Sequence, residues 1–238
     1  GAALYIDLRD LFIDNLESIL PKALKFWILP PLKVLERLTL GRAKRVNIVS
    51  PAFSSYSAIE NLACPITHYT NGVDKRFLRV DFSKRNTSGP PVVLYVGNIG
   101  KGQGLHHVVP EIARLMPAVN FKVIGSGALR LKLLTYIDNF SLNNVQILDP
   151  MMRDDLLPHY RDADILFLHL NDIKAFEKVI PSKIFEYSAT EKPILAGVSG
   201  YAAEFLREYI RDAQIFEPKD IRDMRSKLIY LLGRKEKI

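Results

Sequence analysis

The chain has 238 residues, of which 48% are hydrophobic and 25% charged. This is the composition of a globular protein, and it excludes a disordered chain. The single cysteine, Cys64, excludes a disulfide framework and is compatible with a reducing compartment such as the cytoplasm.

The formal net charge is +7, and the basic excess is concentrated between residues 22 and 45. Seven Lys or Arg side chains stand there against one acid, Glu36, among aromatic and aliphatic side chains. Two interpretations stay open: a segment that docks on an anionic membrane surface, or an ordinary surface helix whose apolar side belongs to the core. No recognised motif accompanies the charge, so we expect no nucleic acid partner. No apolar run approaches the ~20 residues that span a bilayer.

Short apolar runs alternate with amphipathic stretches along the chain. The runs are continuous rather than alternating, as buried parallel strands require. Alternation of strand and helix predicts right-handed crossovers and doubly wound parallel sheets of the α/β class. The predicted strands are residues 4–8, 46–49, 66–69, 92–96, 121–124, 145–148, 165–169, 194–196 and 214–216.

The predicted organisation changes at residues 83–91, a polar, proline-ended segment that we interpret as a linker. Residues 1–82 then form one Rossmann-like unit and residues 92–217 another, with a last helix in 218–238. The first unit shows only three strands and the chain has no initiator Met, so we expect this unit to be incomplete. Pro110 conflicts with a helix from Gly104 onward, and we expect that helix to kink or begin late.

Two glycine-rich turns follow predicted strands of the second unit. The first runs from Gly97 to Gly104 and the second comprises Gly125, Ser126 and Gly127. Glycines let backbone amides approach phosphate oxygens, and the following helix adds the positive end of its dipole. The first turn is neither a P-loop nor a dinucleotide fingerprint. A tight strand-to-helix turn without a ligand is the alternative for both.

A third candidate segment runs from Pro181 to Tyr187. Pro181 suits the first turn of a helix, and Ser182 can cap it. Lys183 and Glu186 share one helix face, so the lysine and exposed amides suit a diphosphate and the carboxylate can accept both hydroxyls of a ribose. The alternative is a surface ion pair worth only ~0.3 kcal/mol.

In order and spacing, these motifs resemble the family-4 retaining glycosyltransferases of the GT-B fold, and most closely the bacterial branch that adds amino sugars during O-antigen and capsule assembly. The resemblance rests on Asn71-Gly72-Val73-Asp74 with Phe77, Val96-Gly97-Asn98-Ile99-Gly100, Ile124-Gly125-Ser126-Gly127, Ala163-Asp164-Ile165, Pro181 to Tyr187 and Lys192-Pro193-Ile194.

The resemblance implies two Rossmann-like domains, of which the second binds a nucleotide sugar. By position, Glu186 would hold the ribose, and the backbone of Met151 would meet the base. The other implied donor-binding residues are Gly97, Asn98, Gly100, Gln103, Gly125, Ser126, Gly127, Pro181 and Ser182. Many family members have Arg where this chain has Asn98, and Lys101 or Lys183 can supply the missing charge.

The implied activity is transfer of a sugar, an N-acetylamino sugar in this branch, from a UDP-sugar to a lipid-linked saccharide with retention at the anomeric carbon. No metal or other cofactor is expected. Lys101, Lys183 and helix-start amides would stabilise the charge on the departing diphosphate. The expected place of action is the cytoplasm, at the inner face of the plasma membrane.

Two alternatives remain. One is a GT-B epimerase of UDP-sugars, for which His169 and Asp172 are the only nearby acid–base candidates. The other is a non-catalytic donor-binding or membrane-docking half of a split enzyme. His106 and His107 are expected to be exposed and receive no role.

Overall fold

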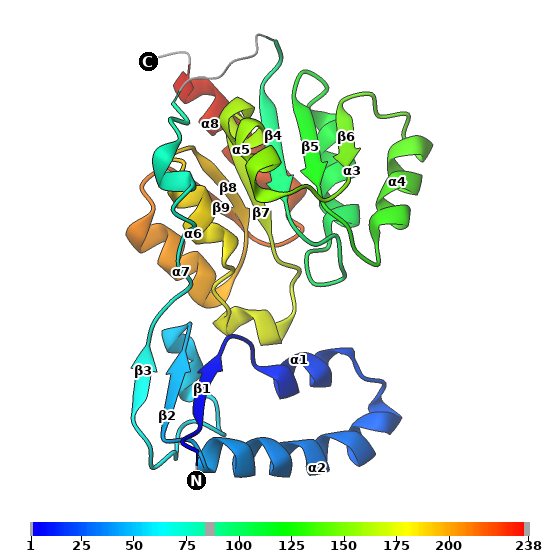
Figure 1. Cartoon of the computed structure of the whole chain (residues 1–238). Helices are drawn as coiled ribbons and strands as arrows, with labels where there is room; N and C mark the ends of the chain where they lie inside the picture. Colours follow the sequence, from blue (N-terminus) through cyan, green and yellow to red (C-terminus); the bar gives the residue numbers. More distant parts are fainter. Residues whose placement is uncertain (1, 84–88, 236–238) are drawn as a thin grey trace. The chain divides into compact units, whose positions relative to one another are not determined.

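The computed structural model describes residues 2–83 and 89–235 of the chain. It is an α/β structure with two parallel sheets, and the nine strands of the described residues are the nine predicted ones, with bounds within one residue (Figure 1). The chain divides into two compact units. The first unit comprises Gly1–Gly72, Ile173–Pro181 and Gly200–Ala202. The second unit comprises Val73–Asp172, Ser182–Ser199 and Ala203–Ile238.

The first unit contains a three-stranded sheet in the order β1-β2-β3. Its strands are β1 (Tyr5–Leu8), β2 (Arg45–Ile48) and β3 (Ile66–His68), and all pairs are parallel. The helices are α1 (Phe12–Ile19), α2 (Lys22–Gly41) and the short 3-10 segments η1 (Pro51–Ser55) and η3 (Lys174–Lys178). Its core gathers Leu11, Leu40, Val46, Ile48, Phe53 and Ile59, among others.

Helix α2 is largely exposed despite its many apolar residues. Only Leu29 and Leu40 of this helix are buried. Trp27 and Leu35 are 75% and 60% exposed. The segment 22–45 therefore contributes Leu40 and Ala43 to the core and leaves other apolar side chains of α2 exposed, so each interpretation describes a part of it.

The second unit has a six-stranded parallel sheet in the order β6-β5-β4-β7-β8-β9. Strand order reverses at β4, whose neighbours are β5 and β7. Ligands of such sheets bind beyond the carboxyl ends of the strands at this point. The strands are β4 (Val92–Val96), β5 (Asn120–Ile124), β6 (Val145–Leu148), β7 (Ile165–His169), β8 (Ile194–Gly197) and β9 (Ala213–Phe216).

Helices connect these strands and cover the sheet (Figure 1). The helical elements of the second unit are η2 (Phe77–Arg79), α3 (Leu105–Leu115), α4 (Arg130–Asn139), α5 (Arg153–Asp162), α6 (Lys183–Ser188), α7 (Gly200–Tyr209, whose first residues belong to the first unit) and α8 (Ile221–Lys235).

Two expectations about α3 are corrected. The helix begins at Leu105 and contains Pro110, so the late start is wrong, while the kink stays a prediction. Pro110 lies in the second turn, where it removes one backbone hydrogen bond but ends nothing. His106, which was expected to be exposed, is only 7% exposed, because its ring lies beside Tyr136 of α4.

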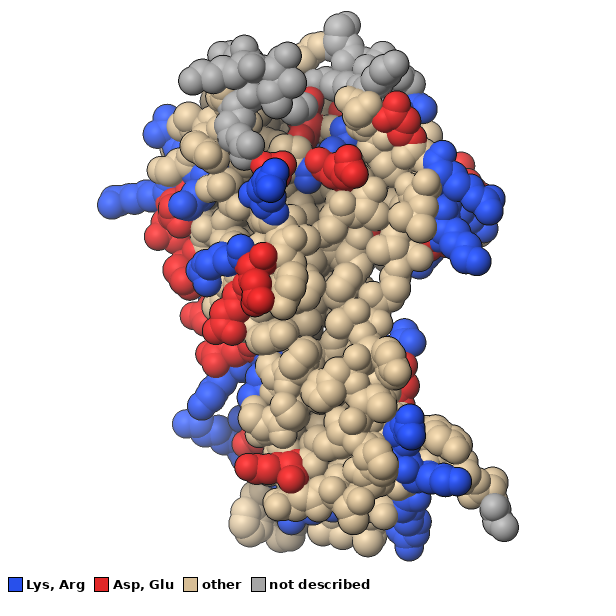
Figure 2. All heavy atoms as spheres, turned by 90° about the vertical axis from the view of Figure 1, so that its left-hand side faces the viewer, with Lys and Arg blue, Asp and Glu red and all other residues tan. Residues whose placement is uncertain are grey.

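In the described chain, no helix combines the length and apolar character needed to cross a membrane. On the face drawn in Figure 2, Lys and Arg side chains occur in small groups between Asp and Glu side chains. The net positive charge thus does not form one continuous basic patch on that face.

Candidate functional site

The two glycine-rich turns lie against each other at the carboxyl ends of β4 and β5. Gly97 N donates to Ile124 O at 3.0 Å, and Ile99 N donates to Ser126 O at 2.7 Å. In return, Leu129 N donates to Ile99 O at 2.9 Å. Backbone hydrogen bonds therefore join the two turns where the strand order of the sheet reverses.

The contact between the turns leaves no room for side chains. A Cβ atom on Gly125 would collide with the carbonyl oxygen of Gly97, and one on Gly127 would collide with the carbonyl of Ile99. Both Gly125 and Gly127 have φ of +151°, which disfavours other residues. Glycine is thus required at these positions for packing, independently of any ligand.

A hollow of about 310 Å³ opens beside the two turns. Among the predicted site residues, Gly97, Asn98, Gly125, Ser126 and Met151 line it. Its other lining residues are Val96, Ile124, Pro150 and Leu156. The structure therefore brings residues from three loops of the second unit around one concave space.

The rest of the first turn, up to Gly104, is held by hydrogen bonds among its own residues. Asn98 Nδ2 donates to Gln103 Oε1 at 3.1 Å, and the two side chains lie across Gly100. Gln103 N and Gly104 N both donate to Gly100 O, at 3.3 and 3.1 Å. The side chain of Lys101 projects from this turn and is exposed.

Helix α6 begins at Lys183, so Pro181 lies outside it rather than in its first turn. Ser182 precedes the helix but its side chain makes no capping hydrogen bond. Its φ and ψ of −57° and −25° are already helical, whereas a capping residue needs an extended backbone. The predicted Ser182 cap is therefore wrong.

Glu186 lies at the centre of a polar cluster. Its Oε2 atom is 2.6 Å from Lys183 Nζ and accepts a hydrogen bond of 3.3 Å from the Tyr160 hydroxyl. Its Oε1 atom is 3.8 Å from a terminal nitrogen of Arg153. The side chain of Glu186 is 14% exposed and that of Lys183 is 28% exposed. The predicted pair therefore exists, and its low exposure distinguishes it from an ordinary surface ion pair.

Tyr187 fixes α6 to the sheet next to the glycine turn. The backbone N–H of Val96, the last residue of β4, donates to the Tyr187 hydroxyl at 3.2 Å. That hydroxyl donates to Phe167 O on β7, also at 3.2 Å. Burial raises the pKa of Tyr187. Tyr187 therefore ties α6, the helix that carries Glu186, to Val96, which lines the hollow.

Arg153 was not singled out by the sequence. It begins α5, where its guanidinium contacts both Glu186 and, at 3.1 Å, Asp74 Oδ2. A hydrogen bond from the backbone N–H of Arg76, together with the charges of Arg76 and Arg153, lowers the pKa of Asp74. Arg153 therefore joins the Asn-Gly-Val-Asp motif to the ribose-binding candidate. Its position two residues after Met151 is the only signal that the sequence offered.

His169 and Asp172 were the acid–base candidates of the epimerase alternative. His169 is fully buried at the end of β7, and both of its ring nitrogens contact backbone groups. Asp172 is exposed. A fully buried imidazole with two backbone partners is not available to a sugar, so His169 does not serve as an acid or base here.

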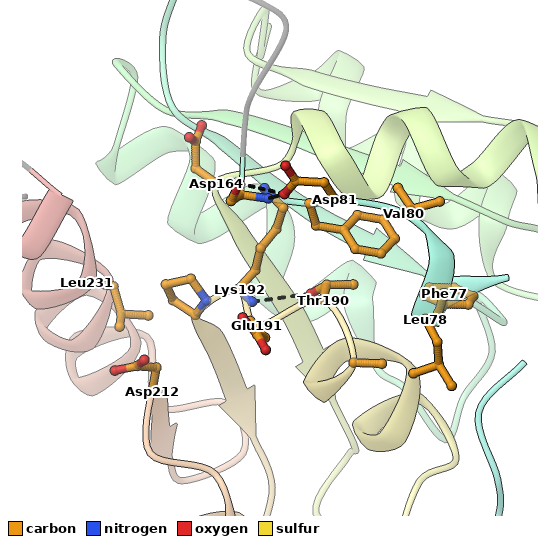
Figure 3. A pocket seen from close by; sticks show the side chains of 14 residues that line it. Phe77, Leu78, Val80, Asp81, Asp164, Thr190, Glu191, Lys192, Asp212 and Leu231 are labelled. Atoms are coloured by element: carbon orange, nitrogen blue, oxygen red, sulfur yellow. Dashed lines mark hydrogen bonds between the residues drawn. The ribbon is translucent and has the colours of Figure 1, made fainter. Parts of the chain in front are cut away.

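A larger hollow of about 750 Å³ lies at the opposite edge of the sheet (Figure 3). Its polar groups hold the amino ends of strands. Asp164 Oδ2 accepts from Val92 N at 2.7 Å, and Lys192 Nζ donates to Ala163 O at 2.6 Å. Ligands of parallel sheets bind at the carboxyl ends, so the candidate site is the smaller hollow with the Glu186 cluster.

A doubly wound parallel sheet with glycine turns at its reversal point is the arrangement typical of nucleotide-binding α/β domains. The family model of the glycosyl transferases group 1 matches residues 78–237. The chain therefore belongs to the glycosyl transferases group 1, and its fold is that of the GT-B glycosyltransferases. No curated protein sequence matches the chain.

Solved structures with this fold include Anabaena HepE in complex with UDP and glucose, at a TM-score of 0.72 and 18% identity over 99% of this chain and 63% of HepE. Sucrose-phosphate synthase from Thermosynechococcus elongatus has a TM-score of 0.72 and 15% identity over 96% of this chain and 58% of the synthase. A glycosyltransferase from Rickettsia africae has a TM-score of 0.64 and 17% identity over 86% of this chain and 57% of that glycosyltransferase. The chain thus spans less than two thirds of the length of these proteins.

Proposed function

We propose that this chain binds a UDP-sugar in the hollow beside the two glycine turns and serves in the transfer of its sugar. The observation that carries the proposal is the Glu186 cluster, in which a largely buried carboxylate contacts Lys183 and Arg153 on a helix that Tyr187 bonds to the last residue of β4. The choice of uracil as the nucleotide base is supported by HepE, whose structure was solved with UDP and with UDP-glucose.

In this proposal the ribose hydroxyls donate to Glu186 and the diphosphate meets Lys183, Lys101 and Arg153. The 2.6 Å contact between Lys183 and Glu186 keeps both groups in place before the nucleotide arrives. An ionised carboxylate accepts two hydroxyl hydrogen bonds while still facing a cation. The nucleotide therefore adds to the cluster without leaving a buried charge unpaired.

We further propose the chemistry that the family resemblance implies. The bond between the anomeric carbon and the diphosphate oxygen breaks, and the electron pair remains on the diphosphate. Lys183, Lys101 and Arg153 stabilise that charge, so the step needs no metal. A hydroxyl oxygen of a lipid-linked saccharide bonds to the anomeric carbon with retention, and its proton passes to the departing diphosphate. The sugar transferred is an N-acetylamino sugar of O-antigen or capsule assembly.

Substitution of Glu186 tests the donor site. Hydrogen bonds to a charged acceptor contribute about 1.5–3 kcal/mol each, so the loss of two of them in Glu186→Ala should weaken UDP binding by at least about 150-fold. Glu186→Gln keeps one acceptor oxygen and should lose about tenfold. Titration calorimetry with UDP and with GDP measures both, and the exposed Glu204→Gln on α7 is the matched control. Unchanged UDP affinity in Glu186→Ala, or tighter binding of GDP than of UDP, would overturn this assignment.

The epimerase alternative is weakened by the burial of His169. Incubation of the protein with the donor alone distinguishes the two reactions, since an epimerase forms a new sugar epimer without acceptor.

The split-enzyme alternative is compatible with a chain that covers 63% of the length of HepE. A donor-binding half would bind UDP normally yet transfer sugar only when a second chain is added.

We also propose that α2 docks on the inner, anionic face of the plasma membrane, where the lipid-linked acceptor lies. Its exposed side carries an apolar stripe of helical spacing that is roughly 21 Å long, comprising Leu24, Trp27, Pro31, Val34, Leu35 and Leu38. Lys22, Lys25, Lys33 and Arg37 on the same helix supply positive charge. Apolar insertion beside cations suits anionic lipid, whereas the cations of two copies would repel each other.

Trp27 reports on this docking directly, because it is the only tryptophan of the chain. Vesicles with anionic phosphatidylglycerol should shift its emission to shorter wavelength and carry the protein into the pellet, less so at high salt. Trp27→Ser with Leu35→Ser should abolish sedimentation. The matched control is Leu131→Ser, which alters a leucine 77% exposed on α4 of the second unit. Equal behaviour with neutral and anionic vesicles would contradict docking.

A further inference from the structure

Three consecutive carbonyl groups of the first glycine turn are held by residues 169–171, at the end of β7. The ring nitrogen Nδ1 of His169 lies 2.6 Å from Gln103 O. Asn171 N donates to Gly102 O at 2.7 Å, and Asn171 Nδ2 donates to Lys101 O at 3.2 Å. The contact follows from the topology, since β4 and β7 are neighbours where the strand order reverses.

These contacts determine which way the turn presents its amides. In a trans peptide the N–H points opposite to the C=O. With the carbonyls of Lys101, Gly102 and Gln103 directed at residues 169–171, the N–H groups of the same peptides point away from that segment, and those of Gln103 and Gly104 donate to Gly100 O inside the turn. Gly104 adopts φ of +60° where the Asn171 side chain packs against it, 3.1 Å from where a Cβ would stand. The segment thereby sets the shape of the turn.

The imidazole of His169 is held in one tautomer. Nδ1–H donates to Gln103 O, and Nε2 accepts from Lys219 N at 3.4 Å. Burial, with the nearby charges of Lys219 and His107, lowers the pKa of His169 to about 4, although the bond to Gln103 acts in the other direction. The ring is therefore neutral at physiological pH, as both bonds require.

The sheet also makes room for this ring. Gly197 pairs with His169 in the register of β7 and β8. A Cβ atom at Gly197 would collide with the His169 ring and with Phe216. A larger residue on β8 would therefore displace the imidazole from Gln103.

We propose that His169 is a positioning residue for the donor site: through the carbonyl of Gln103 it holds the turn 97–104 in the shape that receives the diphosphate. This rests on the proposed function, because it needs a nucleotide at that turn. His169 itself is buried and touches no substrate. A turn that is already ordered loses less conformational freedom when the ligand binds.

Two isosteric substitutions separate the two ring nitrogens. The side-chain amide of Asn places a donor near Nδ1, whereas that of Gln places its polar atoms near Nε2. His169→Asn should therefore keep UDP affinity within about threefold of the wild type, while His169→Gln and His169→Leu should lose about tenfold. Both Asn and Gln destabilise a buried site, so equal losses in the two variants would refute a positioning role. So would unchanged affinity in the Gln and Leu variants.

Hydrogen exchange supplies a readout that does not need the ligand. Backbone amides of residues 102–104 should exchange faster in His169→Gln than in His169→Asn or in the wild type. If the wild type fails to bind UDP while this exchange difference appears, the proposed function fails, but the conclusion that His169 orders the turn 97–104 stands. If residues 102–104 exchange at the same rate in the wild type, His169→Asn and His169→Gln, then His169 does not order the turn.

Asn171→Ala provides a second test should His169→Leu not fold. The Asn171 side chain is not buried, and its removal deletes the bond to Lys101 O while the backbone bond to Gly102 O remains. UDP affinity should fall about threefold, and exchange at 102–104 should rise. His68→Gln, at an exposed histidine of β3, is the matched control that should change neither quantity.

Discussion

The second unit should lose stability in mild acid because two of its histidines are buried in the neutral form. Burial, followed by the charges of His107 and Lys132, lowers the pKa of His106 to about 4. The pKa of His169 is also lowered to about 4. The unfolded chain binds these protons near the ordinary value of 6.5, whereas the folded chain binds them only near 4. The stabilisation is therefore complete above pH 6.5 and is lost as the pH falls from 6.5 towards 4.

The size of the effect follows from those two values. Each pKa unit corresponds to about 1.4 kcal/mol, and for one such histidine the free energy of unfolding should fall by about 2 kcal/mol between pH 7 and pH 5. The two together should cost about 4 kcal/mol, against roughly 5–15 kcal/mol for a whole domain. Mild acid should thus unfold the second unit or bring it close to unfolding.

His106→Leu isolates half of this loss. The Nδ1 atom of His106 is buried without a hydrogen-bond partner in the described structure, so leucine should stabilise the unit by about 1 kcal/mol at pH 7. It should also reduce the loss between pH 7 and pH 5 by about 2 kcal/mol. Urea unfolding followed by circular dichroism at both pH values measures this, and Trp27 fluorescence reports the first unit separately.

The exposed His68→Leu in the first unit is the control for the substitution itself. An equal loss of stability between pH 7 and pH 5 in His106→Leu and the wild type would refute the reasoning. A pH-dependent change seen only by Trp27 fluorescence would place the acid-sensitive step in the first unit and would refute it as well.

Two further substitutions test the site. Gly125→Ala places a Cβ against the Gly97 carbonyl and should destabilise the second unit by about 3 kcal/mol or prevent folding. The control is Gly233→Ala in α8, where a Cβ meets open space, and it should stabilise the unit by about 0.5–1 kcal/mol in the same urea titration. Arg153→Gln should weaken UDP binding about tenfold in calorimetry and reduce its salt dependence, because a cation beside Glu186 is lost; unchanged affinity would remove Arg153 from the proposed site.

The sheets were predictable from sequence because continuous apolar runs leave little choice. A run such as 92–96 can be satisfied only when both faces of the strand are covered, and parallel pairing between crossover helices provides that. The Lys183–Glu186 pair was predictable for a similar local reason, since residues three apart share a helix face. Local periodicity therefore determined both the elements and this pair.

Features that depend on two distant segments were not predictable. His106 was expected to be exposed because nothing in its neighbourhood shows that its side of α3 faces Tyr136. The bonds from residues 169–171 to Lys101, Gly102 and Gln103 join segments about 70 residues apart. The Ser182 cap failed because residue type alone does not determine φ and ψ.

The glycine turns show why residue type can suggest the right site for an incomplete reason. Gly125 and Gly127 are required because the turns after β4 and β5 touch each other, and this holds with or without a phosphate. Glycine at these positions is therefore equally expected in a protein that binds no nucleotide. A half-hidden carboxylate between Lys183 and Arg153 has no such structural reason, because apolar side chains would pack as well at lower desolvation cost. The proposed donor site accordingly rests mainly on Glu186 and its cations, while the two turns supply part of the lining of the hollow.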